Sequence, residues 1–435
     1  MRIRSVGMIA TALAVALTAA ACGGNDKSST SSDNKAATDP KSLNASLTWW
    51  DTSDPKNEAP AFQELIKKFN VEYPNVKIDY QSVPFADAQN KFKTAAGAKT
   101  GAPDILRAEV AWVPELASLG YLYNLDGSDL LKDESDFLPT PLSADKYEGK
   151  TYGVPQVTDS LALLYNKKMF AAAGITAAPK TWAEVKTAAA TIKSKTGKQA
   201  LFINSGGYFL LPFIYGEGGD LVDAGAKKIT VNSPQAVAGV KIAQDLVKDG
   251  TAVKPPANDA YGNMMTLFKE QKVAMIINGP WEVNNIKDAP TFGGLDNLGI
   301  APVPGGSAKA AGPVGGHNYT IWSGMPKEKV AAAVAFVKFM SSAESQAFIA
   351  GKLGLLPTRK SAYDLPGVKD NATVAAFKPV IDAAVARPWI PEGGQFFDPM
   401  DKMAVEVLVQ NKDPKASLDA VAKTYKSEVV KDYSN

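Results

Sequence analysis

One histidine and one cysteine limit the chemistry that this chain can perform. A Ser-His-Asp triad would have to use His317, and a metal centre built from several histidines is excluded. His317 stands within Gly315-Gly316-His317-Asn318-Tyr319, which we expect to form a loop. We therefore favour a structural or solvent-exposed histidine over a catalytic one.

Other common catalytic and cofactor motifs are absent from the sequence. Apart from Cys22 the chain has no thiol, so the chain after it forms neither a disulfide nor a Cys-based metal site. There is no GxxxxGK[ST] phosphate loop, and no GxGxxG follows a predicted strand. We expect no cofactor and no metal.

Polar residues that could contact a ligand follow the first predicted strand, at residues 47–50. Asp51, Thr52 and Asp54 lie on the loop after it. Loops at the carboxyl ends of strands form the ligand crevices of α/β sheets. We expect at least one of these three side chains to contact ligand.

The elements that must position such residues alternate between strands and helices. Apolar residues Phe62, Leu65, Ile66 and Phe69 share one helix face, and residues 76–80 alternate as a strand. Further strands are predicted at 104–106, 161–165, 200–203 and 273–277, and helices near 115–118, 182–195, 234–249, 327–340 and 416–431. This alternation predicts α/β layering, in an enzyme or in a binding protein.

Two predicted helices begin with recognisable caps. Thr181 and Glu184 form a capping box, in which Thr181 caps the helix and Glu184 reaches back to the cap. Ser233 followed by Pro234 starts the second helix, and Gly250 ends it.

Length and charge narrow the class of protein. The 435 residues suffice for two or three domains, and 45% of them are hydrophobic, as in a globular protein. With 47 basic and 45 acidic residues the net charge is +2, which leaves no basic face for nucleic acid. We expect a monomer that does not bind nucleic acid.

The N-terminus is typical of an exported protein. Two arginines precede a short apolar run and small residues that end at Cys22, and a Ser-rich polar stretch follows. Cys22 at this place resembles the lipidated cysteine of bacterial lipoproteins, although Ala19 stands where Leu is usual. The alternative is an ordinary secreted protein cut at Ala-x-Ala. We expect a signal peptide at 1–21 and a lipidated N-terminus with a flexible tether at 22–44.

Six motifs, in the same order, resemble the extracellular sugar-binding proteins of ABC importers, above all the maltose- and maltodextrin-binding group. Each is weak alone, and the resemblance as a whole covers the chain from about residue 47 to about residue 433. They are residues 47–53 (LTWWDTS), 101–105 (GAPDI), 149–155 (GKTYGVP), 164–167 (LYNK), 179–185 (PKTWAEV) and 274–281 (AMIINGPW).

The resemblance implies a two-lobed periplasmic-binding-protein-like α/β fold of class II. Its N-terminal lobe would comprise residues 45–157 and 316–368, and its C-terminal lobe 158–315 and 369–435. Ligand would bind in the cleft between the lobes and be trapped by hinge closure. The implied protein is no enzyme: it captures maltodextrin-like oligosaccharides at the outer face of the cytoplasmic membrane and delivers them to a membrane permease.

The resemblance also implies site residues, because a sugar ring needs an aromatic face beneath it and polar groups around it. Trp281 and Tyr208 match stacking residues of the group, and we expect Phe209 to belong to the core. Asp159 matches an acidic residue that accepts sugar hydroxyls. Glu109 and Trp112 lie where the group places polar and aromatic cleft residues.

One stretch departs from the group. Where the best-known maltose binder has a third stacking Trp, an ungapped comparison places Met400. We expect Gln395, Phe396 and Phe397, just before it, to contact ligand, and Phe396 or Phe397 to supply the missing aromatic face.

Three alternatives stay open at this stage. A secreted glycosidase needs two carboxylates across a sugar site, and acidic residues are plentiful. The ligand could be another oligosaccharide, such as trehalose, cellobiose or xylobiose, or a different solute such as a peptide or a polyol phosphate. A purely structural surface lipoprotein would need no aromatic-lined cleft.

Overall fold

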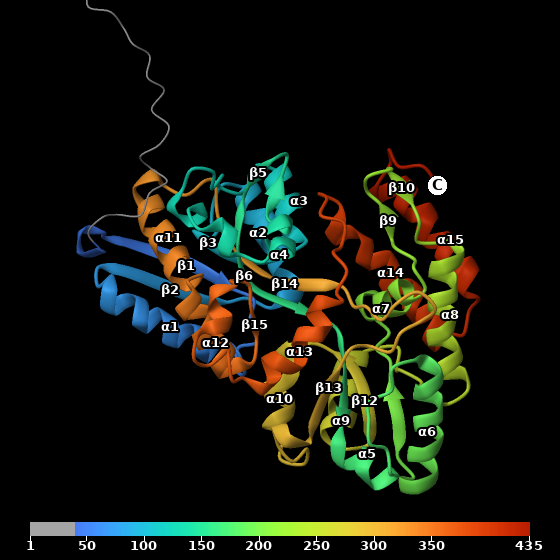
Figure 1. Cartoon of the computed structure of the whole chain (residues 1–435). Helices are drawn as coiled ribbons and strands as arrows, with labels where there is room; N and C mark the ends of the chain where they lie inside the picture. Colours follow the sequence, from blue (N-terminus) through green and yellow to red (C-terminus); the bar gives the residue numbers. More distant parts are fainter. Residues whose placement is uncertain (1–39) are drawn as a thin grey trace, which may run out of the picture.

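A computed structural model describes residues 40–435. Cys22, the predicted signal peptide and most of the predicted tether lie outside the described residues. The described chain forms two α/β lobes, each built on one mixed sheet with helices on both faces (Figure 1).

The first lobe is built on a six-stranded sheet of order β15-β6-β14-β3-β1-β2. Its strands are β1 (Ala45–Asp51), β2 (Val76–Ser82), β3 (Ile105–Glu109), β6 (Gly153–Ser160), β14 (Val314–Ile321) and β15 (Leu356–Pro357). β1 runs parallel to β2 and β3, while β14 is antiparallel to both β3 and β6.

Helices cover both faces of this sheet because side chains alternate along β1. Trp49 packs in a core with α1 (Ala59–Glu72), α11 (Lys327–Met340) and α12 (Ala343–Leu353). Its neighbour Trp50 packs on the other face with α2 (Phe85–Gly97) and α3 (Trp112–Ser118). The short α4 (Pro139–Ala144) and the hairpin β4 (Lys146–Tyr147) and β5 (Lys150–Thr151) complete this lobe.

The second lobe is built on a five-stranded sheet of order β11-β8-β12-β7-β13. Its strands are β7 (Ala162–Asn166), β8 (Gln199–Phe202), β11 (Ala252–Val253), β12 (Val273–Asn278) and β13 (Leu298–Ala301). β12 runs parallel to β8 and antiparallel to β7.

Two cores also flank this sheet. One face packs on α5 (Lys167–Ala173), α6 (Trp182–Thr196), α7 (Leu211–Gly216), α8 (Pro234–Lys248), α14 (Phe397–Ala404) and α15 (Pro414–Thr424). The other packs on α9 (Ala260–Lys269), α10 (Val283–Lys287) and α13 (Ala372–Asp382). A hairpin of β9 (Val222–Asp223) and β10 (Lys228–Ile229) lies near the C-terminus.

The chain crosses between the two sheets three times. It leaves the first sheet after β6, returns from β13 to β14, and leaves again after β15 towards α13. The fold is therefore the predicted two-lobed α/β architecture with several crossings, and the connections lie between the lobes (Figure 1).

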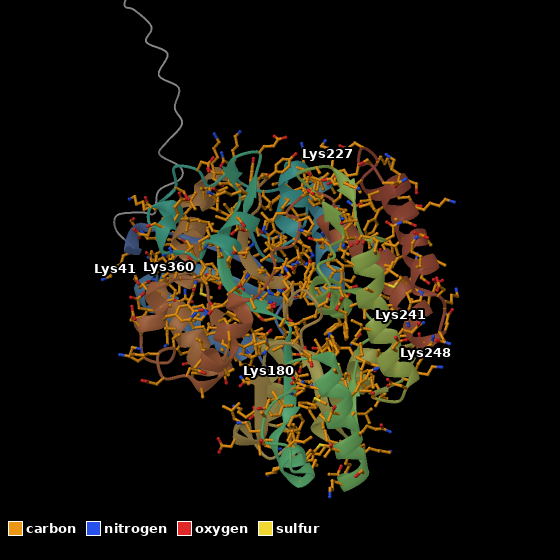
Figure 2. All side chains as sticks on the ribbon, turned by 45° about the vertical axis from the view of Figure 1, so that its right-hand side comes forward. Lys41, Lys180, Lys227, Lys241, Lys248 and Lys360 are labelled. Carbon is orange, nitrogen blue, oxygen red and sulfur yellow. The ribbon has the colours of Figure 1, made fainter. Side chains whose placement is uncertain are left out.

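Exposed lysines mark the outer surface of both lobes (Figure 2). They include Lys41, Lys180, Lys227, Lys241, Lys248 and Lys360.

Two local predictions need correction. His317 lies in the middle of β14 and not in a loop, because the Gly-Gly pair before it continues the strand. Thr181 caps α6 as predicted, with its hydroxyl accepting from the Glu184 N–H at 3.2 Å. The Glu184 carboxylate, however, accepts from the N–H of Lys180 at 2.7 Å, one residue before the cap.

Candidate ligand-binding cleft

A cavity of about 900 Å³ lies between the two lobes. It falls at the upper end of the range usual for small-molecule sites, about 300–1,000 Å³. Thr52 and Glu109 reach it from the ends of β1 and β3 in the first lobe, and Tyr208 and Trp281 reach it from the second lobe. The strand ends therefore place polar and aromatic side chains from both lobes around one space.

Beneath the cavity, Arg107 on β3 holds the loop after β1 in place. Its Nε donates to Gln156 at 2.7 Å, and its Nη1 donates to the Thr52 hydroxyl at 3.3 Å. Asp51 faces the guanidinium at 3.7 Å and also accepts from the Tyr80 hydroxyl at 2.8 Å. Arg107 is thus already neutralised and hydrogen-bonded before any ligand arrives.

A second buried arginine joins segments far apart in the chain. Arg387 donates to the Glu109 carboxylate and, through Nε, to the carbonyl oxygen of Val314 at 3.0 Å. Glu109 also accepts from the N–H of Ala111 at 2.9 Å. This ion pair ties the segment after α13 to the end of β3, so both charges are matched within the protein.

Asp159, near the end of β6, faces the cavity from a buried position. The residue is only 8% exposed, and within residues 40–435 its carboxylate has no hydrogen-bond donor. Burial, with the nearby charge of Glu109, raises its pKa to about 7, and Arg387 and Arg107 only partly oppose this. The carboxyl group can therefore accept hydrogen bonds from a ligand.

Close packing at Gly315 on β14 orients Asp159. A Cβ atom there would lie 2.2 Å from the Asp159 Oδ1 and 2.9 Å from the Tyr208 hydroxyl. Only glycine leaves room for both side chains over the strand, so β14 forms the floor under this part of the cavity.

The loop before α1 supplies two more carboxylates. Glu58 is buried, and one of its oxygens accepts from the N–H of Asp54 at 3.0 Å. Burial raises the pKa of Glu58, while Arg107 opposes the shift. Asp54 is exposed and accepts from the N–H groups of Lys56 and Asn57 at 2.9 and 2.7 Å.

Trp281 presents its ring where β12 ends. β12 stops at Asn278 and a 3-10 turn follows at Pro280–Glu282. The indole lies over Gly279, where a Cβ would come within 1.9 Å of the ring, and its Nε1 donates to the Tyr261 hydroxyl at 2.8 Å. Trp281 is half-buried and packs against cores of both lobes.

Other aromatic rings line the remaining walls. Tyr208 lies edge-on to Phe209 and Phe397, with ring centroids 5.9 and 6.0 Å apart. On the opposite lobe, the ring centroids of Phe85 and Trp112 lie 5.2 Å apart, and the rings are tilted by 30° to each other. Such faces suit a ligand with apolar faces and a rim of hydroxyl groups, each stacked ring adding about 0.5–1.5 kcal/mol beyond the area it buries.

The structure brings eight of the predicted site residues onto one cavity. They are Thr52, Asp54, Glu109, Trp112, Asp159, Tyr208, Trp281 and Phe397. Phe209, expected in the core, is half-buried and also lines the cavity.

Three predicted site residues lie elsewhere. Asp51 is fully buried beneath the cavity in its contacts with Arg107 and Tyr80. Phe396 is 1% exposed and packs on Tyr425 in the core, with ring centroids 4.8 Å apart. Gln395 is exposed on the 3-10 turn Gly393–Phe396 and does not line the cavity, since that turn directs Phe397 inward instead.

Several lining residues were missed from the sequence. Glu58, Arg107, Tyr261 and Arg387 carry no local motif, because distant chain segments bring them to the cavity. For His317 the only local strand signal was Tyr319-Thr320-Ile321 after it, which the two preceding glycines obscured. Burial and the two arginines lower the pKa of His317 well below its usual value, so it is a neutral ring at the cavity wall.

Within the described part of the chain, no cluster of three His, Cys, Asp or Glu side chains could hold a metal ion. No helix among the same residues is both long and apolar enough to cross a membrane.

Comparisons with known proteins identify chains of similar sequence and fold. The family model described as bacterial extracellular solute-binding protein matches residues 53–347. The GacH receptor of Streptomyces glaucescens, solved without ligand and with acarbose, is 45% identical with a TM-score of 0.86, and the match covers 90% of this chain and all of that one.

Two curated relatives are similar over most of their length. A maltotriose-binding protein of Pyrococcus abyssi is 28% identical over 394 residues, which is 88% of this chain and 81% of that protein. A maltooligosaccharide ABC transporter solute-binding lipoprotein of Streptococcus pneumoniae is 28% identical over 334 residues, covering 73% of this chain and 75% of that protein.

Proposed function

Because the chain belongs to the family of bacterial extracellular solute-binding proteins, we propose that it captures an oligosaccharide of the maltodextrin type for an ABC importer. The observation that carries this proposal is the cavity between the lobes. Aromatic faces from both lobes and carboxylates such as Asp159 surround it. The names of the relatives, which bind maltotriose, maltooligosaccharides or acarbose, point to the same class of ligand.

The charges of the cavity favour a sugar over an anionic solute. A phosphate group is commonly bound by an unpaired arginine or lysine beside a helix N-terminus. Both arginines that line the cavity already bond to Asp51 or Glu109, and the remaining charged groups there are carboxylates. A polyol phosphate would therefore enter a space of its own sign.

The protein is proposed to bind the sugar without cleaving it. The relatives are named as binding proteins and receptors, and the two lobes suit capture by hinge closure. Incubation of the purified protein with maltodextrin should release no reducing sugar. Turnover that is lost together with Asp159 would instead support a glycosidase.

A thermal-shift screen tests the choice of ligand. Maltose and maltotriose should raise the melting temperature, because a ligand at 100 times its Kd adds about 2.7 kcal/mol to stability. Trehalose, cellobiose and xylobiose serve as matched alternatives with different linkages or rings. A shift with cellobiose or xylobiose alone would replace the maltodextrin proposal, and no shift with any sugar would overturn the proposed function.

Anchoring and delivery belong to the same proposal. Cys22 would carry the lipid that holds the monomer at the outer face of the cytoplasmic membrane, within reach of its permease. Two lobes would then close over the sugar, one of residues 45–157 with 316–368 and the other of residues 158–315 with 369–435. Two acyl chains suffice for stable attachment. Cys22→Ala should release the protein into the medium, and retention in the membrane fraction would refute the anchor.

A further inference from the structure

The cavity carries more negative charge than its own residues neutralise. Its charged side chains are two arginines and five carboxylates: Arg107, Arg387, Asp54, Glu58, Glu109, Asp159 and Asp401. Arg387 pairs with Glu109, and Arg107 pairs with Asp51 beneath the floor. No cation of the described residues pairs with the other four carboxylates at salt-bridge distance.

These four carboxylates differ in how far their own surroundings satisfy them. Asp54 is exposed and accepts two backbone N–H bonds, and Asp401 is exposed and accepts from the N–H of Gly207 at 2.6 Å. Glu58 is buried and accepts one bond, from the N–H of Asp54. Asp159 is buried and accepts none within residues 40–435.

Asp159 and Glu58 line the same cavity, and the charge of Glu58 acts on Asp159. Burial and then the charge of Glu109 disfavour ionisation of Asp159, and the charge of Glu58 adds a smaller effect. Burial likewise disfavours ionisation of Glu58. A cation close to a carboxylate favours its charged form, so a positive group in the cavity near these carboxylates would offset this cost.

We propose that this cavity selects an oligosaccharide that carries a basic amine, and that Asp159 with Glu58 receives the amine. The inference rests on the proposed function, since the aromatic walls would still hold the sugar rings. A hydroxyl group can also donate to Asp159, but it brings no positive charge to the two carboxylates.

The proton needed for this contact is accounted for. Asp159 has a pKa of about 7, so near neutral pH part of the protein holds a proton on this carboxyl group. An amine entering the cavity takes up that proton, or arrives with one from solvent, and the pair becomes an ammonium beside a carboxylate. Hydrogen bonds between charged partners are roughly twice as strong as neutral ones.

The other charged groups near Asp159 keep their places when the amine binds. Glu109 stays paired with Arg387, and Arg107 stays bound to Gln156 and Thr52. His317 stays neutral because burial and the arginines hold its pKa low. The selectivity therefore depends on Asp159 and Glu58.

Titration calorimetry with acarbose and maltotetraose tests the proposal. Acarbose is a pseudotetrasaccharide in which a secondary amine replaces one glycosidic oxygen, and maltotetraose is its neutral counterpart. We expect acarbose to bind at least about tenfold more tightly at pH 7. Asp159→Asn should bring the ratio of the two affinities to within about threefold, because the amide cannot hold the negative charge.

Two further variants keep the test decisive. Glu58→Gln should lower the same ratio, and it replaces Asp159→Asn if that variant does not fold. Asp296→Asn removes one exposed carboxylate outside the cavity and should leave the ratio unchanged.

The outcomes separate this inference from the proposed function. Equal affinities for acarbose and maltotetraose, or a preference for acarbose that survives both cavity variants, would overturn the amine inference alone. Binding of neither compound would overturn the proposed function, and the amine inference with it.

Discussion

At the scale of single residues, the cleft separates side chains that support its walls from side chains that remain free to bind. Arg387 pairs with Glu109 and donates to the backbone of β14, and Arg107 donates to a side chain on β6. These contacts fix the backbone around the cavity. Asp159 and the ring of Trp281 instead present unused surface to it. Substitutions at the first group should affect folding, and substitutions at the second should affect binding.

Trp281→Ala tests this division. The ring stands on Gly279 after the strand has ended, and it is half-buried at the cavity wall. We expect the affinity for maltotriose to fall at least tenfold, about 1.4 kcal/mol, with little change in the melting temperature of the ligand-free protein. Calorimetry and thermal unfolding measure the two quantities.

A core tryptophan provides the matched control. Trp182 is 6% exposed and stacks on Phe213, with ring centroids 4.2 Å apart. Trp182→Ala should cost about 3–5 kcal/mol of stability, as large core truncations do. If Trp281→Ala behaved in this way and kept its affinity, Trp281 would belong to the core and not to the site.

Residue types after strand ends could be read from the sequence, but their partners could not. Trp281 follows a Gly-Pro pair that ends a buried strand, so the sequence predicted that Trp281 lies outside the sheet. The ion pair between Glu109 and Arg387 joins residues 278 positions apart, and only the folded chain brings them together. The sequence likewise did not distinguish Phe397, which lines the cavity, from its buried neighbour Phe396.

At the scale of elements, local signals predicted what local physics determines. The cap residues Thr181 and Ser233 accept from backbone N–H groups three residues later, both at 3.2 Å, as their sequence patterns predicted. The predicted helix at 327–340 has those bounds in the structure. Such features depend on neighbours within one turn, so a sequence pattern suffices.

Elements held by distant contacts were harder to predict. His317 was expected in a loop because Gly315 and Gly316 precede it, yet pairing with β3 and β6 extends the strand through both glycines. The segment after α13 has no periodic pattern. It is fixed at Val385, whose N–H donates to the carbonyl of Gly312 at 2.9 Å and whose carbonyl accepts from the N–H of Val314 at 2.8 Å.

At the scale of the whole molecule, α2 of the first lobe lies close to the 3-10 turn Gly393–Phe396 of the second. A Cβ atom at Gly394 would lie 3.3 Å from Nε2 of Gln89 on α2. Trp281 packs against cores of both lobes as well. The lobes therefore approach each other at Gln89 and Gly394, and we expect opening of the cleft to separate these two residues.

Closure predicts a change of size in solution. We expect the ligand-free protein to populate an open form and maltotriose to shift it to the closed one, because the ligand contacts both lobes only in the closed form. Small-angle scattering should show a smaller radius of gyration when the sugar is added. Identical curves with and without a sugar that calorimetry shows to be bound would contradict hinge closure.

Gly394→Trp tests where the lobes meet. Even one added carbon would touch Gln89, so an indole at this position should hold α2 and the 3-10 turn Gly393–Phe396 apart. With maltotriose the variant should keep the larger radius of the ligand-free protein, and its affinity should fall at least tenfold, about 1.4 kcal/mol. Its ligand-free melting temperature should change little, because neither lobe's core is altered.

Gly225→Trp is the control, because it adds the same ring to the β9–β10 hairpin. A Cβ atom there has one close neighbour among the described residues, the Asp223 carboxylate at 3.5 Å. This variant should close and bind like the unmodified protein. If Gly394→Trp also closed and bound normally, the contact between Gln89 and Gly394 would not be what limits closure.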